Sequence, residues 1–274
     1  EAQWLKFASD GALVPPEKRW MNTDGVMDTY WSQAPALTPC FVMTAYQLPK
    51  YFRRWNPAGP EIFSLEGADL LIMDESGQVD TSLGASAFAL AKRALVVGDT
   101  QQLAPVWSID PESDEEIAGV NGLASHWDEM VEKGLTASSP SSIMAAAASA
   151  SGWSYGAEDD PGLFLSEHFR CHPDIINYCN ELLYKGMLVP SRGSDGYKLK
   201  GLTKPFLFCE VAASEDKPSG SSRVNEKEAV AIAEWIEDNY DYFAGIYDED
   251  GNDAGNVVGV VTPFAAQARL IEQK

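Results

Sequence analysis

The sequence predicts an α/β fold in which parallel strands are flanked by helices. Two short apolar runs, at residues 68–73 and 94–97, each end abruptly in acidic and amide side chains. A continuous apolar run of this length is typical of a strand that is buried on both faces of a parallel sheet. A helical pattern at residues 81–92 lies between them. Strand, helix and strand joined by short links indicate a parallel βαβ unit.

The segments before this unit carry weaker signals. Residues 1–35 are rich in Trp, Pro and Asp, and we expect them to be irregular. A short strand is expected at 39–44, because the residues there are mostly apolar, and a helix at 45–55.

The character of the chain changes after the βαβ unit. Residues 108–160 begin with an acidic loop, and their Ser- and Ala-rich stretch, 137–151, is close to low complexity. Such composition is typical of linkers. We therefore expect a first domain at 1–160, with an insertion or linker at 108–160, and a second domain at 161–274. In the second domain we expect a helix from Pro173 to about Tyr184, a strand at 206–211, an amphipathic helix at 225–240, a turn at 248–256, a buried strand at 257–261 and a helix from Pro263 to the end.

Composition limits the class of protein. The hydrophobic fraction is 45%, which suits a globular protein, and no apolar run approaches the ~20 residues that a membrane span needs. Four cysteines without CxxC spacing predict reduced thiols in an intracellular, cytoplasmic protein. The chain starts without Met, so we expect it to be a piece of a longer polypeptide. The formal charge of −21 argues against a broad nucleic-acid-binding surface, although a local groove can still be basic.

The carboxyl ends of the two predicted strands carry the residues that indicate chemistry. Asp74 and Glu75 follow the first strand, and Gly98 and Asp99 follow the second. Ligands of open parallel sheets bind at this edge. Two adjacent carboxylates there suit phosphoryl transfer, since one can hold Mg²⁺ while the other orients or deprotonates water. The pattern therefore predicts a nucleotide-driven protein.

Five segments, in order, resemble the motifs of superfamily 1 helicases, which are AAA-type helicase ATPases, and in particular their Upf1-like and Dna2-like branch. The first two, Asp-Glu-Ser-Gly-Gln at 74–78 and Gly-Asp-Thr-Gln-Gln-Leu-Ala-Pro-Val at 98–106, are similar to motifs II (the Walker B motif) and III. Glu-His-Phe-Arg-Cys-His-Pro at 167–173 is similar to the motif IV region. The next two signatures match Asn-Glu-Lys-Glu-Ala at 225–229 and Val-Thr-Pro-Phe-Ala-Ala-Gln at 261–267. The resemblance implies two RecA-like domains of the P-loop NTPase class, both incomplete here, with ATP and Mg²⁺ in the cleft between them.

The resemblance also implies roles at the nucleotide. Asp74 would bind Mg²⁺, and Glu75 would act as the general base or orient the attacking water. Gln102 would contact the γ-phosphate or this water, and Arg170 would act as an arginine finger. The resemblance also implies that Asp99 and Glu228 lie near the nucleotide.

A second set of residues is assigned to single-stranded DNA or RNA. Thr44, Thr262 and Pro263 would lie along the nucleic-acid groove, and Gln78 would link the two ligands. The implied activity is ATP-driven movement along a strand.

One departure from the family pattern bears on activity. No GxxxxGK[ST] phosphate loop occurs in the sequence, so we expect this chain alone to be inactive and its parent to supply the missing loop. Two alternatives stay open. The parent could be an ATPase switch that does not translocate, which the acidic charge favours, or a catalytically inactive interaction module.

Overall fold

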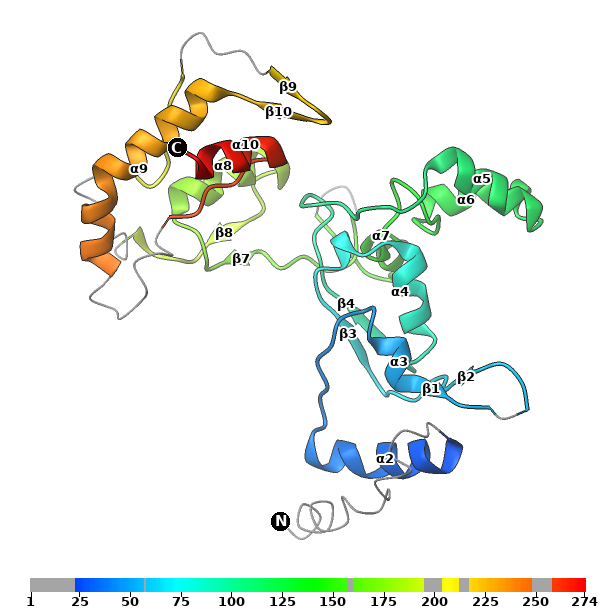
Figure 1. The fold of residues 1–274 in the computed structure, drawn as a ribbon. Coiled ribbons are helices and arrows are strands. Elements are labelled where there is room, and N and C mark those ends of the chain that lie inside the picture. The colour runs from blue at the N-terminus through cyan, green and yellow to red at the C-terminus, as the bar shows by residue number, and fades with distance from the viewer. Residues whose placement is uncertain (1–22, 57, 157–159, 195–203, 212–216, 248–257) are drawn as a thin grey trace. The chain divides into compact units, whose positions relative to one another are not determined.

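The computed structural model describes residues 23–56, 58–156, 160–194, 204–211, 217–247 and 258–274 (Figure 1). The chain divides into two compact units, Glu1–Phe164 and Leu165–Lys274. In the described part of the first unit the elements are α2 (Asp24–Leu37), α3 (Leu48–Phe52), β1 (Arg53–Arg54), β2 (Ile62–Phe63), β3 (Leu71–Met73), η2 (Ser76–Gln78), α4 (Thr81–Phe88), β4 (Ala94–Val96), α5 (Pro111–Val120), η3 (Ala124–His126), α6 (Trp127–Glu132), α7 (Ile143–Ser149), β5 (Ser154–Tyr155) and β6 (Asp160–Pro161). Those of the second unit are β7 (Glu167–His168), α8 (Pro173–Leu183), β8 (Val189–Pro190), β9 (Lys217–Ser219), β10 (Ser222–Val224), α9 (Glu226–Tyr247) and α10 (Ala265–Glu272).

The predicted βαβ unit is confirmed as β3, α4 and β4. The two strands pair in parallel, with Leu71 opposite Ala94 and Met73 opposite Val96. Helix α4 begins after Asp80, whose carboxylate accepts the Leu83 amide at 2.9 Å as a helix cap. The sequence pattern is thus sufficient to locate this part of the fold.

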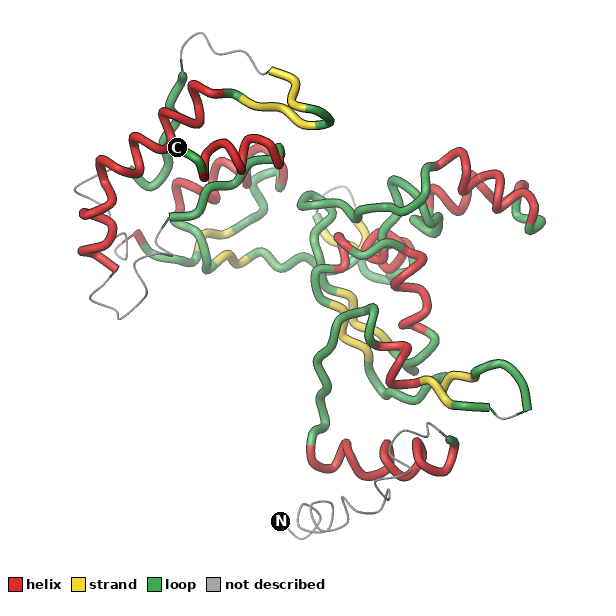
Figure 2. Tube along the Cα trace, viewed as in Figure 1, coloured by secondary structure: helices red, strands yellow, loops and turns green. Residues whose placement is uncertain are grey.

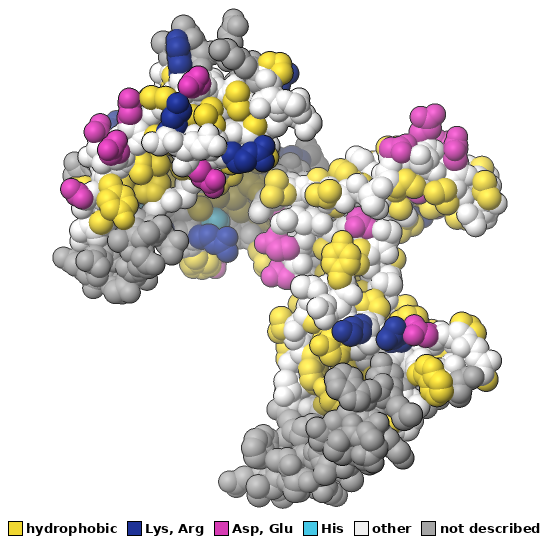
Figure 3. Space-filling view, viewed as in Figure 1, with side chains coloured by type: hydrophobic (Ala, Val, Ile, Leu, Met, Phe, Trp, Pro, Cys, Tyr) yellow, Lys and Arg dark blue, Asp and Glu magenta, His cyan; other side chains and the backbone are white. Residues whose placement is uncertain are grey.

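The larger parallel sheet that the sequence predicts does not form among the described residues. Each sheet there has two strands, and two pairs, β3–β4 and β7–β8, are parallel (Figure 2). The expectation that β3 and β4 are buried on both faces is wrong for this structure. Ile72 is 58% exposed and Leu95 is 52% exposed, whereas Met73 is buried. One face of the pair packs on the core, and hydrophobic side chains of the first unit remain visible at its surface (Figure 3).

The Ser- and Ala-rich stretch is packed and does not form a linker, whereas the alternative of an insertion at 108–160 stays a prediction. Ile143 of α7 is fully buried and joins Met73 and Ala87 in the hydrophobic core. Its amide donates to the Val79 carbonyl at 2.9 Å. Small residues allow close packing of α7 against α4, since a Cβ on Gly84 would lie 2.0 Å from Ile143 Cγ1. The segment is therefore part of the first unit's core.

Buried polar contacts hold the loop before α7. The Asp114 carboxylate accepts the amides of Ala137 and Ser138 at 2.8 and 2.9 Å. The Trp107 indole donates to the Ser141 carbonyl at 2.9 Å. These partners are more than twenty residues apart, so composition alone could not reveal them.

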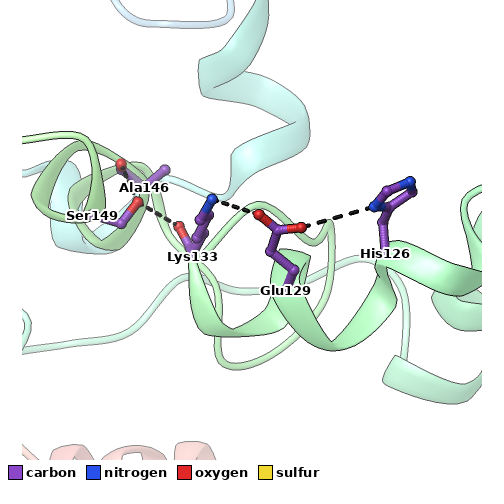
Figure 4. A network of polar contacts seen from close by, with 5 residues as sticks. All are labelled: His126, Glu129, Lys133, Ala146 and Ser149. Atoms are coloured by element: carbon purple, nitrogen blue, oxygen red, sulfur yellow. Dashed lines mark hydrogen bonds and ion pairs between the residues drawn. The ribbon is translucent and has the colours of Figure 1, made fainter.

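Helices α5 and α6 extend away from the β3–β4 pair, and acidic side chains gather on them (Figures 1 and 3). On α6, Glu129 lies between His126 and Lys133, at 3.8 and 2.6 Å, and the Lys133 carbonyl accepts the Ser149 hydroxyl of α7 (Figure 4). The hydrogen bond from Lys133 and then its positive charge lower the pKa of Glu129, and Glu129 in turn raises the pKa of Lys133. These contacts connect α6 to α7.

Three predicted strands are not observed. Residues 39–44, 206–211 and 258–261 are irregular, and Val42, Phe208 and Val261 are 93%, 87% and 97% exposed. A strand needs a neighbour to accept and donate its ladder hydrogen bonds, and no strand pairs with these segments within the described ranges. Residue 257 and the predicted turn at 248–256 lie outside the described residues.

Residues 24–37 form helix α2 rather than irregular structure. Trp31 stacks on Phe52 with ring centroids 5.0 Å apart and meets Phe41 edge-on at 5.3 Å. Asp28 pairs with Arg54 at 2.8 Å. The remainder of the predicted irregular segment, residues 1–22, lies outside the described part. No described helix is both long and apolar enough to cross a membrane.

The second unit follows its helical pattern more closely. The predicted helix from Pro173 is α8, the amphipathic helix at 225–240 is the longer α9, and the helix after Pro263 is α10. Helix α10 packs on α9 and β10. All four cysteines of the chain are free thiols.

Candidate functional site

The carboxyl ends of β3 and β4 hold the first group of predicted site residues together. The Val97 amide donates to the Met73 carbonyl at 2.8 Å, and the Ser76 amide donates to the Val97 carbonyl at 3.0 Å. These two bonds continue the parallel ladder past the strands. The turn that carries Asp74 and Glu75 therefore lies beside the loop that follows β4.

Glycines make this approach possible. A Cβ on Gly77 would lie 2.5 Å from the Asp99 carbonyl oxygen, and one on Gly98 would lie 2.8 Å from the Gly77 nitrogen. Real Cβ atoms do not come this close to backbone atoms, so a side chain at either position would force the loops apart. Close backbone approach was predicted from the sequence at Gly98, whereas Gly77 was named only as part of the 74–78 motif. The signal that could have found Gly77 is a glycine directly after two acids and a serine at a strand end.

Glu75 adopts a left-handed backbone conformation, with φ 53° and ψ 35°. This region costs a residue with a side chain about 1–2 kcal/mol, and such conformations are concentrated at functional sites. The Glu75 amide donates to Asp74 Oδ1 at 3.0 Å, and the buried Ser76 hydroxyl donates to the Met73 carbonyl at 2.8 Å. The turn holds both carboxylates exposed to solvent.

Glutamine side chains donate hydrogen bonds to two of the acids at this edge. Gln78 Nε2 donates to Glu75 Oε2 at 3.1 Å. On the facing loop, Gln102 Nε2 donates to Asp99 Oδ2 at 2.8 Å. The backbone N–H of Gln101 donates to Asp99 Oδ1 at 2.9 Å. The structure thus brings Asp74, Glu75, Gln78, Asp99 and Gln102 to one edge of the β3–β4 pair.

The opposite end of the pair carries a different electrostatic feature. Asp69, just before β3, accepts from Lys92 Nζ at 2.7 Å. This hydrogen bond and the charge of Lys92 lower the pKa of the Asp69 carboxyl. Asp69 therefore forms an exposed ion pair with Lys92.

Thr44, predicted at the nucleic-acid groove, lies in the loop before α3. Its carbonyl accepts the amides of Gln47 and Leu48 at 2.9 and 3.2 Å, and the residue is exposed. No contact that the structure describes joins it to the β3–β4 edge, so its role stays a prediction.

The second unit carries the other predicted residues. Arg170 lies in the turn between β7 and α8, and it is exposed. Within the described ranges its guanidinium makes no hydrogen bond or ion pair, whereas its carbonyl accepts from Arg192 Nη1. The backbone of this arginine is held, and its side chain is exposed to solvent.

Glu228, Thr262 and Pro263 come together at a pocket of about 350 Å³ between α9, α10 and the loop before α10. The buried residues Asn225 and Gln267 form part of its wall. The Gln267 side chain makes two hydrogen bonds to the backbone of Asn225. Its Oε1 accepts from the Asn225 backbone N–H at 2.7 Å, and its Nε2 donates to the Asn225 backbone carbonyl at 3.0 Å. The remaining lining residues are Arg223, Val224, Ile232, Val260, Val261, Phe264 and Ile271.

This pocket brings together residues that the sequence analysis had assigned to two ligands. Glu228 was assigned to the nucleotide, and Thr262 and Pro263 to the nucleic acid. Arg223, which precedes the Asn225 motif, was not predicted as a site residue, and it adds a positive charge at the pocket. No pattern in the sequence marks that arginine.

The family model of the AAA domain matches residues 148–274. A comparison with curated proteins finds no significant match. The matched range contains Arg170 and the pocket of the second unit, and it begins after the acidic edge of β3 and β4. The second half of the chain therefore resembles an AAA domain of the helicase-like kind, which is consistent with a helicase-like ATPase.

Proposed function

We propose that the full-length protein is a superfamily 1 helicase or translocase that couples hydrolysis of ATP to movement on single-stranded DNA or RNA. The observation that carries the proposal is the edge where Asp74 and Glu75 lie beside the Asp99–Gln102 loop. Phosphoryl transfer depends on such positioned carboxylates and amides, because catalysis there consists mainly of positioning and charge stabilisation. In this proposal the two units correspond to two RecA-like domains.

Mg²⁺ fits the donors at this edge. Nucleotide-bound Mg²⁺ is usually held by one or two carboxylates together with phosphate oxygens and water. Asp74 offers an exposed carboxylate at the end of β3, so a cluster of three acids is not needed, and none is found among the described residues. The ion would neutralise charge on the phosphates.

Each side chain then has a distinct task. Asp74 holds the metal, and Glu75 accepts the proton of the attacking water or orients it. Gln102, fixed by its bond to Asp99, contacts the γ-phosphate or the same water. Arg170 supplies a guanidinium that stabilises the charge of the transferred phosphoryl group.

Nucleic acid would contact residues outside this edge. Thr44, Thr262 and Pro263 are proposed to line its path, and Gln78, hydrogen-bonded to Glu75, would couple strand binding to hydrolysis. Glu228 lies at the same pocket as Thr262. We propose that Thr262 and Pro263 face the strand at this pocket, and that Glu228 lies near the nucleotide.

Residues 1–274 alone are not expected to hydrolyse ATP, because their sequence contains no GxxxxGK[ST] loop to hold the phosphates. A non-translocating ATPase switch is the second candidate, and the formal charge of −21 favours it. An inactive interaction module is the third.

Strand displacement separates the helicase from its rivals. The full-length protein is incubated with ATP and a duplex that carries a single-stranded tail, and its affinity for the single strand is measured between 50 and 200 mM salt. A helicase releases the strand, and its affinity falls steeply with salt because phosphate contacts release counterions. ATP turnover without displacement would favour the switch, and neither activity in a folded protein would favour the interaction module.

A further inference from the structure

The turn that carries Arg170 is fixed at both ends. On one side, β7 pairs in parallel with β8, and the His168 carbonyl accepts the Ser191 amide at 2.8 Å. On the other side, α8 begins at Pro173, with His172 as its cap. Arg170 extends from the short connection between these two anchors.

A histidine side chain fastens the middle of the connection. The Cys171 amide donates to His168 Nε2 at 2.9 Å, so the imidazole bridges from the end of β7 to the peptide that joins Arg170 to Cys171. An imidazole nitrogen accepts a hydrogen bond only when it carries no proton. His168 Nε2 therefore serves as the hydrogen-bond acceptor in this turn.

A second histidine of the same turn, His172, makes a contact that caps a helix. His172 Nδ1 accepts the Asp174 amide at 3.2 Å, which caps α8. This bond orients the helix, whereas the bond to His168 orients the peptide next to Arg170. The two contacts leave the backbone of Arg170 held and its guanidinium exposed.

We propose that His168 is a positioning residue for Arg170. Its Nε2 fixes the peptide that follows Arg170 and so determines where the guanidinium is presented. Placement matters for this kind of group, because a displacement of about 1 Å can cost about 100-fold in rate. The inference rests on the role given to Arg170 in the proposed function.

The test is a double-mutant cycle on ATP turnover by the full-length protein, with saturating single strand. His168→Leu removes the acceptor, and His168→Gln retains an oxygen at a similar distance from the backbone. His168→Leu should lower kcat about 10-fold to 100-fold with little change in the KM for ATP, because it alters placement rather than ground-state binding. His168→Gln should restore most of the loss. His126→Leu, on the surface of α6, is the matched control and should leave turnover unchanged.

The cycle is completed with Arg170→Ala. If His168 acts through Arg170, adding His168→Leu to Arg170→Ala should cost less than about twofold further, because the two effects share one group. Losses that multiply, or a Gln variant no better than the Leu variant, would overturn the positioning role. Unchanged turnover in Arg170→Ala alone would remove the arginine-finger role, and the inference with it.

A second readout does not depend on activity. Amide hydrogen exchange of residues 168–174 reports opening of the turn. Exchange at Cys171 should accelerate in His168→Leu and stay slow in His168→Gln. Exchange at Cys171 that is as slow in His168→Leu as in the natural sequence would show that the imidazole does not hold the turn.

Discussion

Gly77 shows how closely the residues at the candidate site are packed. The Asp99 carbonyl occupies the position where a side chain would begin, 2.5 Å from a Cβ at residue 77. Asp99 in turn accepts from Gln102 at 2.8 Å. The position of Gln102 therefore depends on the absence of a side chain at Gly77.

Gly77→Ala should destabilise the chain by about 1–3 kcal/mol, the usual cost of forcing atoms into packed space. Chemical denaturation measures this change. The matched control is Gly119→Ala in α5, where a Cβ has nothing within 4 Å, and it should raise stability by up to about 1 kcal/mol because Ala favours helices. A Gly77→Ala variant as stable as the natural chain would contradict the described packing.

Residue identity at the site could be predicted, but residue conformation could not. Asp74, Glu75 and Asp99 were located because short apolar runs mark strand ends, and the strands were confirmed. The left-handed backbone of Glu75 depends on the neighbouring loop, which holds the turn through the Ser76 amide. No local signal in the sequence specifies such a long-range contact.

At the scale of elements, the least expected result is that α7 packs in the core. Alanine and serine give weak periodicity, so the stretch around α7 resembles a linker in composition. What places it in the core is the fully buried residue Ile143, together with polar anchors such as Asp114. These anchors are distant in sequence and could not be inferred from it.

Helices α4 and α7 provide a sharp test of this packing. Ile143→Ala should cost about 2–5 kcal/mol, as expected for a large buried side chain that leaves a cavity, and thermal or chemical denaturation measures it. Gly84→Ala should also destabilise, because its Cβ would lie 2.0 Å from Ile143 Cγ1.

The pair of substitutions should not be additive. In the Ile143→Ala background the space opposite residue 84 is free, so Gly84→Ala should become nearly neutral. Ile117→Ala on α5, where the side chain is 53% exposed, serves as the control and should change stability by less than about 0.5 kcal/mol. A linker would tolerate Ile143→Ala as well as it tolerates Ile117→Ala, and that outcome would contradict the core assignment.

Strands were the elements that sequence patterns predicted least well. The apolar runs at 39–44, 206–211 and 258–261 have strand-like composition, yet they are irregular and largely exposed. Helices such as α8 and α9 satisfy their hydrogen bonds internally and therefore follow local pattern. A strand forms only where a partner lies alongside, and that partner is a property of the tertiary fold.

At the scale of the molecule, the two units carry different parts of the proposed machinery. The acidic edge lies in the first unit, and Arg170 and the pocket around Gln267 lie in the second. The AAA-domain match covers the second unit and begins shortly before it. The helicase-like character of residues 148–274 could be predicted from sequence, whereas large parallel sheets are not found among the described residues.

The most direct test of the account is ATP hydrolysis by the full-length protein, with and without single-stranded DNA or RNA, in the natural sequence and in Glu75→Gln. Glu66→Gln is a matched control, since Glu66 has the same left-handed φ of 53° but lies before β3, away from the acidic edge. The account predicts strand-stimulated turnover that Glu75→Gln lowers at least about 100-fold, as expected for loss of a general base, and that Glu66→Gln leaves intact. Turnover that survives Glu75→Gln, or that neither strand stimulates, would contradict it.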